Sequence, residues 1–159
     1  MYDIQQADLN NAQHAAAVLA LLQHYALDPM GGGEALADDV VRQLIPRLQQ
    51  RQDALIVLAF DGPRSIGLVN SFEGFSTFKA QPLLNIHDVV VHADYRGRGL
   101  SRRMLAHVEQ LARQRGCCKL TLEVLQGNQV AQAAYRACGF GPYELDPAMG
   151  QALFWQKLL

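Results

Sequence analysis

The spacing of apolar residues along the chain predicts alternating helices and strands. Residues 11–25 and 37–50 repeat apolar side chains at the three- and four-residue spacing of amphipathic helices. The faces expected to point inward consist of Ala15, Val18, Leu19 and Leu22 in the first helix and Val40, Val41, Leu44 and Leu48 in the second. Pro46 is expected to end or kink the second helix.

Short apolar runs predict the strands. They cover residues 2–6, 54–61, 65–73, 83–92, 119–125 and 154–158. The second and third runs flank Asp61-Gly62-Pro63-Arg64, which predicts a hairpin. Two further helices are expected. One has Leu100, Met104, Val108 and Leu111 on its inner face, and the other begins after Asn128.

Composition narrows the possible classes of protein. At 159 residues the chain has the size of one domain, which we expect to span residues 1–159. A net charge of −1 with 18% charged residues argues against general binding to nucleic acid or to a membrane surface. No apolar run approaches the roughly 20 residues of a membrane span, and the N-terminus lacks a signal-peptide pattern, so we expect a cytoplasmic protein. The cysteines, Cys117, Cys118 and Cys138, lack the spacing of metal ligands, and no metal is expected.

The segment from Val89 to Ser101 carries the strongest chemical signal. An apolar strand ending in Val89, Val90 and Val91 leads through a basic, glycine-containing turn into a helix. Gly97 and Gly99 let the backbone approach an anion, and a helix start offers unpaired N–H groups and the positive end of the helix dipole. Positive charge is added by Arg96, Arg98, Arg102 and Arg103. We therefore expect a ligand that carries a pyrophosphate.

Two common phosphate sites do not fit this segment. A dinucleotide fingerprint needs a third glycine where Arg102 stands, and the sequence contains no Gly-Lys-Ser or Gly-Lys-Thr to close a P-loop. The segment instead resembles the acyl-CoA signature of the GCN5-related N-acetyltransferases (GNAT), which is Arg or Gln, two residues, Gly, one residue, then Gly or Ala. Arg96, Gly99 and Ser101 occupy these places, and Ser101 departs from the pattern.

A second motif carries the same resemblance further along the chain. Asn128, Ala131, Tyr135, Gly139 and Phe140 reproduce the family's Asn-x-x-Ala-x-x-x-Tyr-x-x-x-Gly-Phe pattern in full. In physical terms Asn128 is also a good helix N-cap, and Gly139 is a helix stop. The resemblance is strong over residues 84–144 and extends to the rest of the chain only through the layout of its elements.

The resemblance implies an α/β (α+β) fold, with a mixed, mostly antiparallel twisted sheet flanked by helices in the order β-α-α-β-β-β-α-β-α-β-β. It implies acetyl-CoA as cosubstrate and direct acetyl transfer to an amine in a ternary complex. It assigns to Tyr135 a hydrogen bond to the departing thiolate. The residues that it assigns to cofactor binding are Val89, Val90, Val91, Arg96, Gly97, Arg98, Gly99, Leu100, Ser101, Arg102, Asn128 and Ala131.

A direct transfer also needs a base, because an alkyl ammonium with a pKa of about 10.4 costs about 4 to 5 kcal/mol to deprotonate at pH 7. Strand alternation places His87 on one face with Asn85, Val89 and Val91, and Asp88 on the other with Val90 and His92. His87 is the better base, because an unperturbed histidine has a pKa of about 6.5, and several family members carry His or Glu at this place. Alternatively His87 is a polar residue at a strand edge and Asp88 pairs with a helix end. A bulge between Ile86 and Val91 would exchange the two faces.

The acceptor is less defined by the sequence. Phe72, Phe75 and Phe78, together with an acidic loop over residues 25–34, suggest a small amine with an apolar portion, although the three rings could equally cap the sheet edge. Three functions stay open: acetylation of a small-molecule primary amine, acetylation of a protein N-terminus or lysine, and non-catalytic binding of acyl-CoA. A homodimer is a further possibility.

Overall fold

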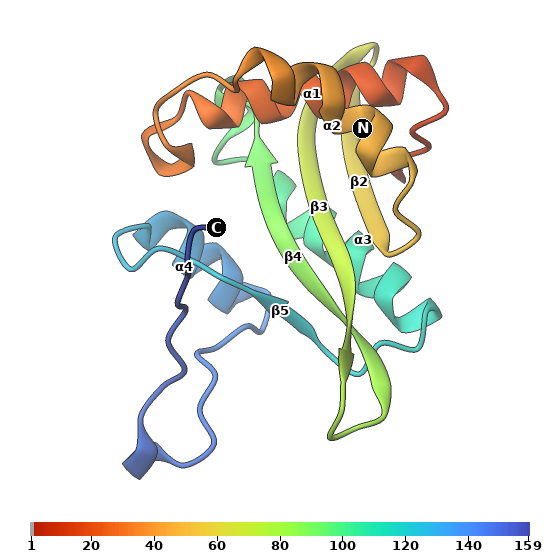
Figure 1. Ribbon diagram of the computed structural model, residues 1–159. Coiled ribbons are helices and arrows are strands. Elements are labelled where there is room, and N and C mark those ends of the chain that lie inside the picture. Colours follow the sequence, from red (N-terminus) through yellow and green to blue (C-terminus); the bar gives the residue numbers. More distant parts are fainter. Residues whose placement is uncertain (1) are drawn as a thin grey trace.

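The computed structural model describes residues 2–159 and is built around one five-stranded sheet with the order β1-β2-β3-β4-β5 (Figure 1). Neighbouring strands are antiparallel from β1 to β4, and β5 is parallel to β4. The strands are β1 (Asp3–Gln6), β2 (Ala54–Asp61), β3 (Arg64–Ser76), β4 (Gln81–Val91) and β5 (Leu120–Leu122). The predicted mixed, mostly antiparallel sheet is thereby confirmed.

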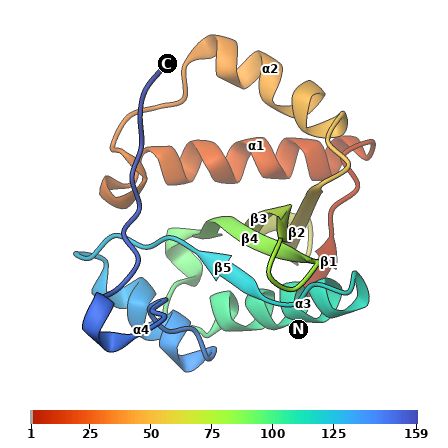
Figure 2. The same cartoon turned by 60° about the horizontal axis from the view of Figure 1, so that its bottom comes forward.

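Helices cover both faces of the sheet (Figure 2). One face is covered by α1 (Ala12–Ala26) and α2 (Asp38–Gln49), and the other by α3 (Leu100–Gln114) and α4 (Gln129–Ala137). Three single helical turns complete the chain: η1 (Pro29–Gly31), η2 (Ala93–Tyr95) and η3 (Pro147–Met149). The connection through η2 links the end of β4 directly to the start of α3.

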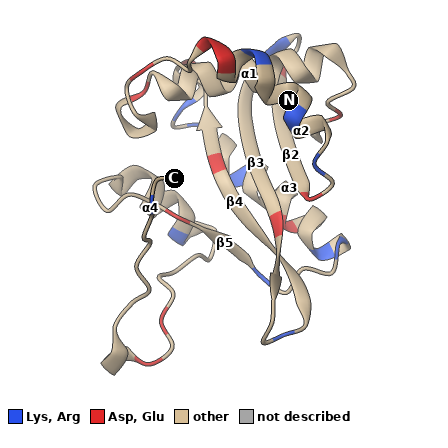
Figure 3. Ribbon diagram, viewed as in Figure 1, with Lys and Arg blue, Asp and Glu red and all other residues tan. Residues whose placement is uncertain are grey.

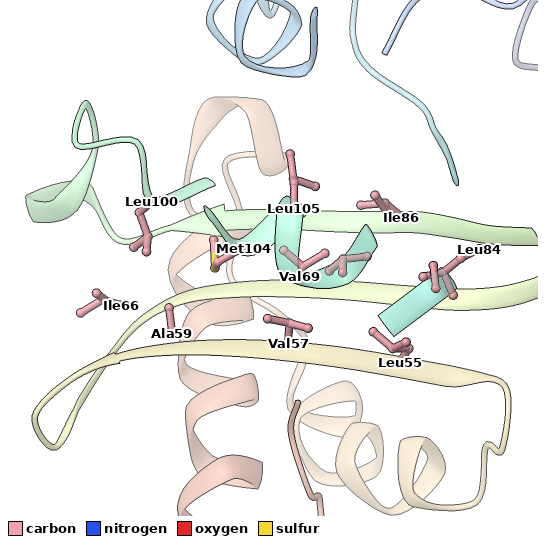
Figure 4. Packing of buried hydrophobic residues seen from close by; sticks show 12 residues of the cluster. Leu55, Val57, Ala59, Ile66, Val69, Leu84, Ile86, Leu100, Met104 and Leu105 are labelled. Atoms are coloured by element: carbon pink, nitrogen blue, oxygen red, sulfur yellow. The ribbon is translucent and has the colours of Figure 1, made fainter. Parts of the chain in front are cut away.

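Side-chain alternation along the strands fills one apolar core on each side of the sheet. The core under α3 includes Leu55, Val57, Ile66, Val69, Leu84, Ile86, Leu100, Met104 and Val108 (Figure 4). The core under α1 and α2 includes Ala17, Val18, Leu21, Leu48, Ile56, Leu58, Phe60, Leu68 and Val90. Gly67 of β3 lets α3 approach closely, since a Cβ there would lie 2.6 Å from the sulfur of the fully buried Met104.

The first part of the chain agrees with the predicted elements, with two corrections. The hairpin is confirmed, because Asp61 pairs with Arg64 around Gly62-Pro63. The buried positions of α1 are Ala17, Val18, Leu21 and Ala26, so the inner face is turned relative to the expected set. In α2 only Leu48 is fully buried.

Pro46 does not end the helix, which continues to Gln49. This proline is exposed, so water can solvate the carbonyl that its missing N–H leaves unpaired.

The C-terminal part differs most from the prediction. β5 ends at Leu122 instead of Leu125, and the expected strand over residues 154–158 is not formed. After α4 the described chain makes one isolated bridge, Glu144 to Gln151, and continues as an exposed extended segment (Figure 1). The two last strands of the predicted order are therefore missing, because an apolar run becomes a strand only where its backbone finds a neighbouring edge.

Candidate functional site

β4 and β5 part from each other halfway along β4. Their pairing begins at Leu84 with Leu120 and ends at Ile86 with Leu122. Beyond this point the two ribbons diverge, β4 toward α1 and β5 toward α4 (Figure 1). In the part of the chain that the structure describes, residues 87–91 thus have no strand partner on this side. This leaves main-chain groups of the strand to an extended ligand, apart from the Val91 carbonyl, which accepts a bond from the Arg96 side chain.

A β-bulge sits at the same point of β4. Asn70 of β3 faces Asp88 and Ser71 faces Ile86, so His87 is an additional residue in β4. Ile86 and Val89 consequently both belong to the core under α3. The bulge turns His87 and Asp88 together toward the face covered by α1.

The predicted face of Asp88, opposite Val89 and Val91, is therefore confirmed, whereas the predicted face of His87 is wrong. His87 does not share a face with Val89 and Val91, which pack under α3, because the bulge interrupts the alternation between Ile86 and Val89. His87 and Asp88 do not exchange faces either; they lie next to each other on the face opposite Val89 and Val91.

A polar cluster surrounds Asp88 on this face. The buried Asn70 side chain donates from Nδ2 to Asp88 Oδ2 at 3.0 Å, and within residues 2–159 its own Oδ1 has no hydrogen-bond partner. Burial raises the pKa of Tyr25, on α1, and the negative charges of Asp88 and Asp28 raise it further. A carboxylate, an amide and a phenol thus converge near the bulge.

His87 lies at the exposed edge of this cluster. Its Nδ1 is 3.3 Å from Asn85 Oδ1, and its ring meets Phe72 edge-on with the ring centroids 5.5 Å apart. Of the three aromatic residues expected near the acceptor, only Phe72 is close to His87. Phe75 and Phe78 are exposed toward the far end of the β3–β4 hairpin.

The turn before α3 has the backbone geometry of an anion site. Gly97 and Gly99 adopt φ angles of 73° and 71°, which favour glycine, and no atom lies within 4 Å of a Cβ built at either position. Gly99 caps α3, and the Arg103 amide is bonded to the Gly99 carbonyl at 3.2 Å. The earlier amides of the first turn are therefore free to bind an anion.

The arginines around this turn point in different directions. Arg96 bonds through its guanidinium to Asp28 at 2.8 Å and to the Val91 carbonyl at 3.2 Å. Arg98 stacks over Tyr95, and Arg103 stacks over Tyr2, both on the side of β1. Arg102 lines the cavity beside Cys138, and Arg96 joins the turn to β4. The four arginines thus do not form the single group that the sequence predicted.

The sequence placed Asp28 within an acidic loop over residues 25–34, but it did not predict the contact of this residue with Arg96. The Met30 backbone N–H and the Arg96 side chain hold the pKa of this carboxyl below its usual range. Asp28 and Arg96 are 68 positions apart, so no local pattern signals the contact. The same holds for His24, which stacks on His92 at a centroid distance of 4.5 Å and accepts the Ala93 amide at 3.3 Å.

The second motif of the sequence forms α4 as expected. Asn128 is confirmed as the N-cap, because its Oδ1 accepts the Ala131 amide at 3.1 Å. Gly139, with a φ of 87°, follows the last turn, and the Phe140 amide bonds back to the Tyr135 carbonyl. Asn128 and Ala131 come to lie at the end of α4 that follows β5.

Tyr135 is half-buried against the core under α3, with its ring edge-to-face on Phe140 at a centroid distance of 6.0 Å. Burial raises its pKa to about 12, and Tyr25 and Cys138 add smaller effects. Because Tyr25 is carried by α1 and Tyr135 by α4, the two phenols approach from opposite faces of the sheet.

The cysteines take no part in this region. All three are free and half-buried, and burial raises the pKa of the Cys117 and Cys138 thiols. They line a cavity of about 320 Å³ between α3, the start of β5 and residues 138–140. Among residues 2–159 no three His, Cys, Asp or Glu side chains group closely enough to hold a metal ion, and no described helix has the length and apolarity to cross a membrane.

Comparison with solved structures shows where this architecture occurs. An integron cassette protein from the mobile metagenome of V. cholerae superposes with a TM-score of 0.78 at 16% identity, covering 99% of this chain and 92% of that one. An aminoglycoside acetyltransferase from an uncultured soil metagenomic sample, in complex with sisomicin, gives 0.78 at 15% identity over 99% and 97% of the two chains. At these levels of sequence identity, the structural similarity shows that the fold is shared and nothing beyond the fold.

Sequence relatives match a shorter part of the chain. The thialysine N-epsilon-acetyltransferase of Bos taurus is 32% identical over 78 residues, which are 49% of this chain and 45% of that protein. The streptothricin acetyltransferase of Streptomyces lavendulae is 41% identical over 68 residues, 43% of this chain and 36% of the relative. The matched regions thus span less than half the length of these relatives. Residues 18–140, however, match the family described as Acetyltransferase (GNAT), and the chain belongs to this family.

Proposed function

We propose that the protein transfers an acetyl group from acetyl-CoA to a primary amine of a small molecule, directly and in a ternary complex. The observation that carries the proposal is the end of β4–β5 pairing at Ile86, next to the free first-turn amides of α3. An unpaired strand beside a helix start suits a ligand that has both an amide-bearing arm and a pyrophosphate.

The residues of this region fit acetyl-CoA. The amides from Gly97 to Arg102, in the glycine-containing turn and in the first turn of α3, would bind the pyrophosphate, with nothing near Gly97 and Gly99 to obstruct it. The ion pair of Arg96 with Asp28 supports this assignment, because the Arg96 side chain already binds one anionic group, the Asp28 carboxylate, beside this turn. The main chain of Val89, Val90 and Val91 would hold the pantetheine arm, and Asn128 and Ala131 would border it from α4. No metal is needed for the transfer.

The bulge suggests how the amine is bound and deprotonated. Asp88 and His87 both face α1, so one can attract the ammonium group while the other accepts its proton, directly or through water. Asp88 is held by Asn70 at 3.0 Å and would bind the ammonium. The exposed His87 would act as the base, since a histidine titrates closest to neutral pH.

Tyr135 would donate a hydrogen bond to the sulfur of CoA as the thiolate leaves. With a pKa of about 12, against about 8.5 for a thiol, full proton transfer would be uphill by about 5 kcal/mol. Its role is therefore stabilisation of the developing charge, while the hydroxyl keeps its proton.

A small-molecule acceptor is supported by the names of the relatives. Besides the thialysine and streptothricin enzymes, an aminoglycoside N(6')-acetyltransferase type 1 from Acinetobacter genomosp. 13 is 25% identical over 107 residues. The open polar cluster of Asp88, Asn70 and Tyr25 could bind a cationic amine of this general kind.

The test is product formation from acetyl-CoA with a panel of small primary amines and of peptides with free N-termini or lysines, detected by mass spectrometry. We expect acetylated small amines. Acetylation of the peptides alone would assign the site to a protein acceptor. Tight binding of acetyl-CoA without any product would indicate a binding module.

A further inference from the structure

Asn85 of β4 lies beside His87, close to the point where the pairing of β4 with β5 ends. It is the register partner of Phe72 in β3 and of Thr121 in β5, so the three side chains form one row across three neighbouring strands. His87 lies at this row, because its ring meets Phe72 edge-on and its Nδ1 is 3.3 Å from Asn85 Oδ1. Asn85 is half-buried, whereas His87 is exposed. Asn85 is thus the polar residue that borders the Nδ1 side of the His87 ring.

The amide nitrogen of Asn85 has its own set of partners on β5. Nδ2 donates to Thr121 Oγ1 at 3.1 Å and to the two carboxylate oxygens of Glu123 at 3.3 and 3.4 Å. Glu123 is the first residue after β5 and is exposed. Figure 3 shows an acidic position on each of the two ribbons near the place where they part. The side chain of Asn85 therefore connects His87 with the carboxylate that follows β5.

Glu123 determines which way the Asn85 amide points. An amide has a donating and an accepting end, whereas an ionised carboxylate only accepts hydrogen bonds. Nδ2 must therefore face Glu123, and this places Oδ1 toward His87. Because a carbonyl oxygen also only accepts, Nδ1 of His87 has to carry the proton of this hydrogen bond. In the neutral histidine the other ring nitrogen, Nε2, then has a free lone pair.

We propose that Asn85, oriented by Glu123, is a positioning residue that holds His87 in this tautomer, an inference that rests on the proposed function. A base needs a lone pair that its substrate can reach. One proton of the ammonium group would pass to Nε2, directly or through water, leaving a neutral amine and an imidazolium with N–H groups on both nitrogens. The hydrogen bond from Nδ1 to Asn85 persists in both forms, and the exposed ring can release the proton to water.

Phe72 restricts the remaining freedom of the His87 ring. The two rings meet at an interplanar angle of 90° with their centroids 5.5 Å apart. Rotation of the imidazole by half a turn would place a carbon atom where Nδ1 is bonded to Asn85, so the hydrogen bond would be lost. The contacts thus favour one orientation of the ring as well as one tautomer.

Nitrogen-15 NMR of the full chain tests the tautomer without any turnover. The chemical shifts of the ring nitrogens distinguish Nδ1–H from Nε2–H in a neutral histidine. The chain has five histidines, and the signals of His87 are assigned by their loss in His87→Gln. At about pH 8.5, where an ordinary histidine is neutral, we expect Nδ1–H for His87, although histidine in water favours Nε2–H. A dominant Nε2–H form would overturn the proposal.

Asn85→Leu removes the hydrogen-bond acceptor at a similar side-chain size. It should return His87 to Nε2–H and lower kcat with a primary amine at least tenfold. In the His87→Ala background the same substitution should have no further effect, because Asn85 acts through His87. Gln81→Leu makes a comparable change at the exposed start of β4 and should keep the tautomer and the original kcat. An equal loss of kcat with and without His87 would assign a purely structural role to Asn85 and reject the proposal.

Glu123→Ala tests the orientation of the amide at an exposed position, where folding is not at risk. The Thr121 hydroxyl both donates and accepts, so the amide can then point either way and both tautomers of His87 are expected. A pure Nδ1–H form in Glu123→Ala would contradict the role of Glu123. If the original protein has Nδ1–H but acetylates no amine, the proposed function fails while the orientation of His87 stands, so the two failures are distinguishable.

Discussion

The carboxylate of Asp28 and the guanidinium of Arg96 are 2.8 Å apart and join the connection after α1 to the turn before α3. Asp28 also caps η1, through the Met30 amide at 2.9 Å. In this ion pair Asp28 is bonded to Arg96, the cation that the sequence motif assigns to phosphate binding. Binding of CoA, as proposed above, would therefore have to compete with this carboxylate or rearrange it.

Replacement of Asp28 with Asn should tighten CoA binding. The amide keeps the cap on Met30 but removes the negative charge that competes for Arg96. Half-exposed ion pairs contribute about 1 kcal/mol or less, so the gain is expected to be up to about fivefold in Kd. Calorimetric titration with CoA measures it. Asp53→Asn removes the partner of another arginine, Arg51, and should leave Kd unchanged. Weaker binding by Asp28→Asn would show that the pair organises the site.

Replacement of Gly99 with Leu should abolish measurable CoA binding, because the side chain would cover the first-turn amides. A φ of 71° also makes the substitution costly for folding, by about 1 to 2 kcal/mol. Gly116 provides the control, since it has a φ of 74° and equally open surroundings. Gly116→Leu should lose similar stability but keep CoA affinity. If both variants bind CoA as the original protein does, the anion site lies elsewhere.

Replacement of Tyr135 with Phe should lower kcat by about 10² to 10³, as expected for the loss of one donor at a developing negative charge. The CoA affinity should barely change, because the ring and its contact with Phe140 stay. Tyr143→Phe removes an exposed hydroxyl and should have the original kcat. Full activity of Tyr135→Phe would reduce Tyr135 to a packing residue.

The two residues of the bulge should have separable effects on kinetics. His87→Ala is expected to lower kcat and to remove the acidic limb of the pH profile of kcat/KM for the amine. Asp88→Asn should mainly raise KM for the amine, because the attraction for the ammonium group is lost. If the pH profile of kcat/KM keeps its acidic limb in His87→Ala, His87 is not the base.

Folding stability should decrease as the pH falls below about 6.5, with His24 as one cause. Burial, and then the nearby His92 and Arg96, lower the pKa of His24 below 6.5. The unfolded chain thus takes up a proton before the folded one does, and stability is lost as the pH falls from 6.5 toward the folded-state pKa. Chemical denaturation of His24→Gln should show that its free energy of unfolding changes less between pH 5 and 7 than that of the original protein. A slope in His24→Gln equal to that of the original protein would exclude His24 as a cause.

Local patterns were sufficient to predict the helix ends of the second motif. The N-cap of Asn128 and the stop at Gly139 depend on neighbours within a few positions, and both are confirmed. The bulge at His87 could not be predicted, because it arises from the register between β3 and β4 and leaves no signature in β4 itself. One additional residue was enough to move His87 to the face opposite Val89.

The contacts and elements that the sequence did not reveal depend on distant parts of the chain. Asp28 reaches Arg96 only after α1 and β4 have packed on each other. The run at residues 154–158 has the composition of a strand, yet the extended segment finds no edge in its own molecule. Propensity describes what a segment can become, whereas pairing depends on which backbone lies beside it.

Gly67 sets the distance between the middle of the sheet and α3. Met104, whose sulfur would lie 2.6 Å from a Cβ at this position, is fully buried and belongs to the same helix as the anion-binding first turn. A single added methyl group on β3 would therefore push on α3 about one helical turn after Leu100 and tilt its start away from β4. If the first turn of α3 binds the cofactor as proposed, the affinity for the cofactor therefore depends on the absence of a single methyl group at Gly67, deep in the hydrophobic core.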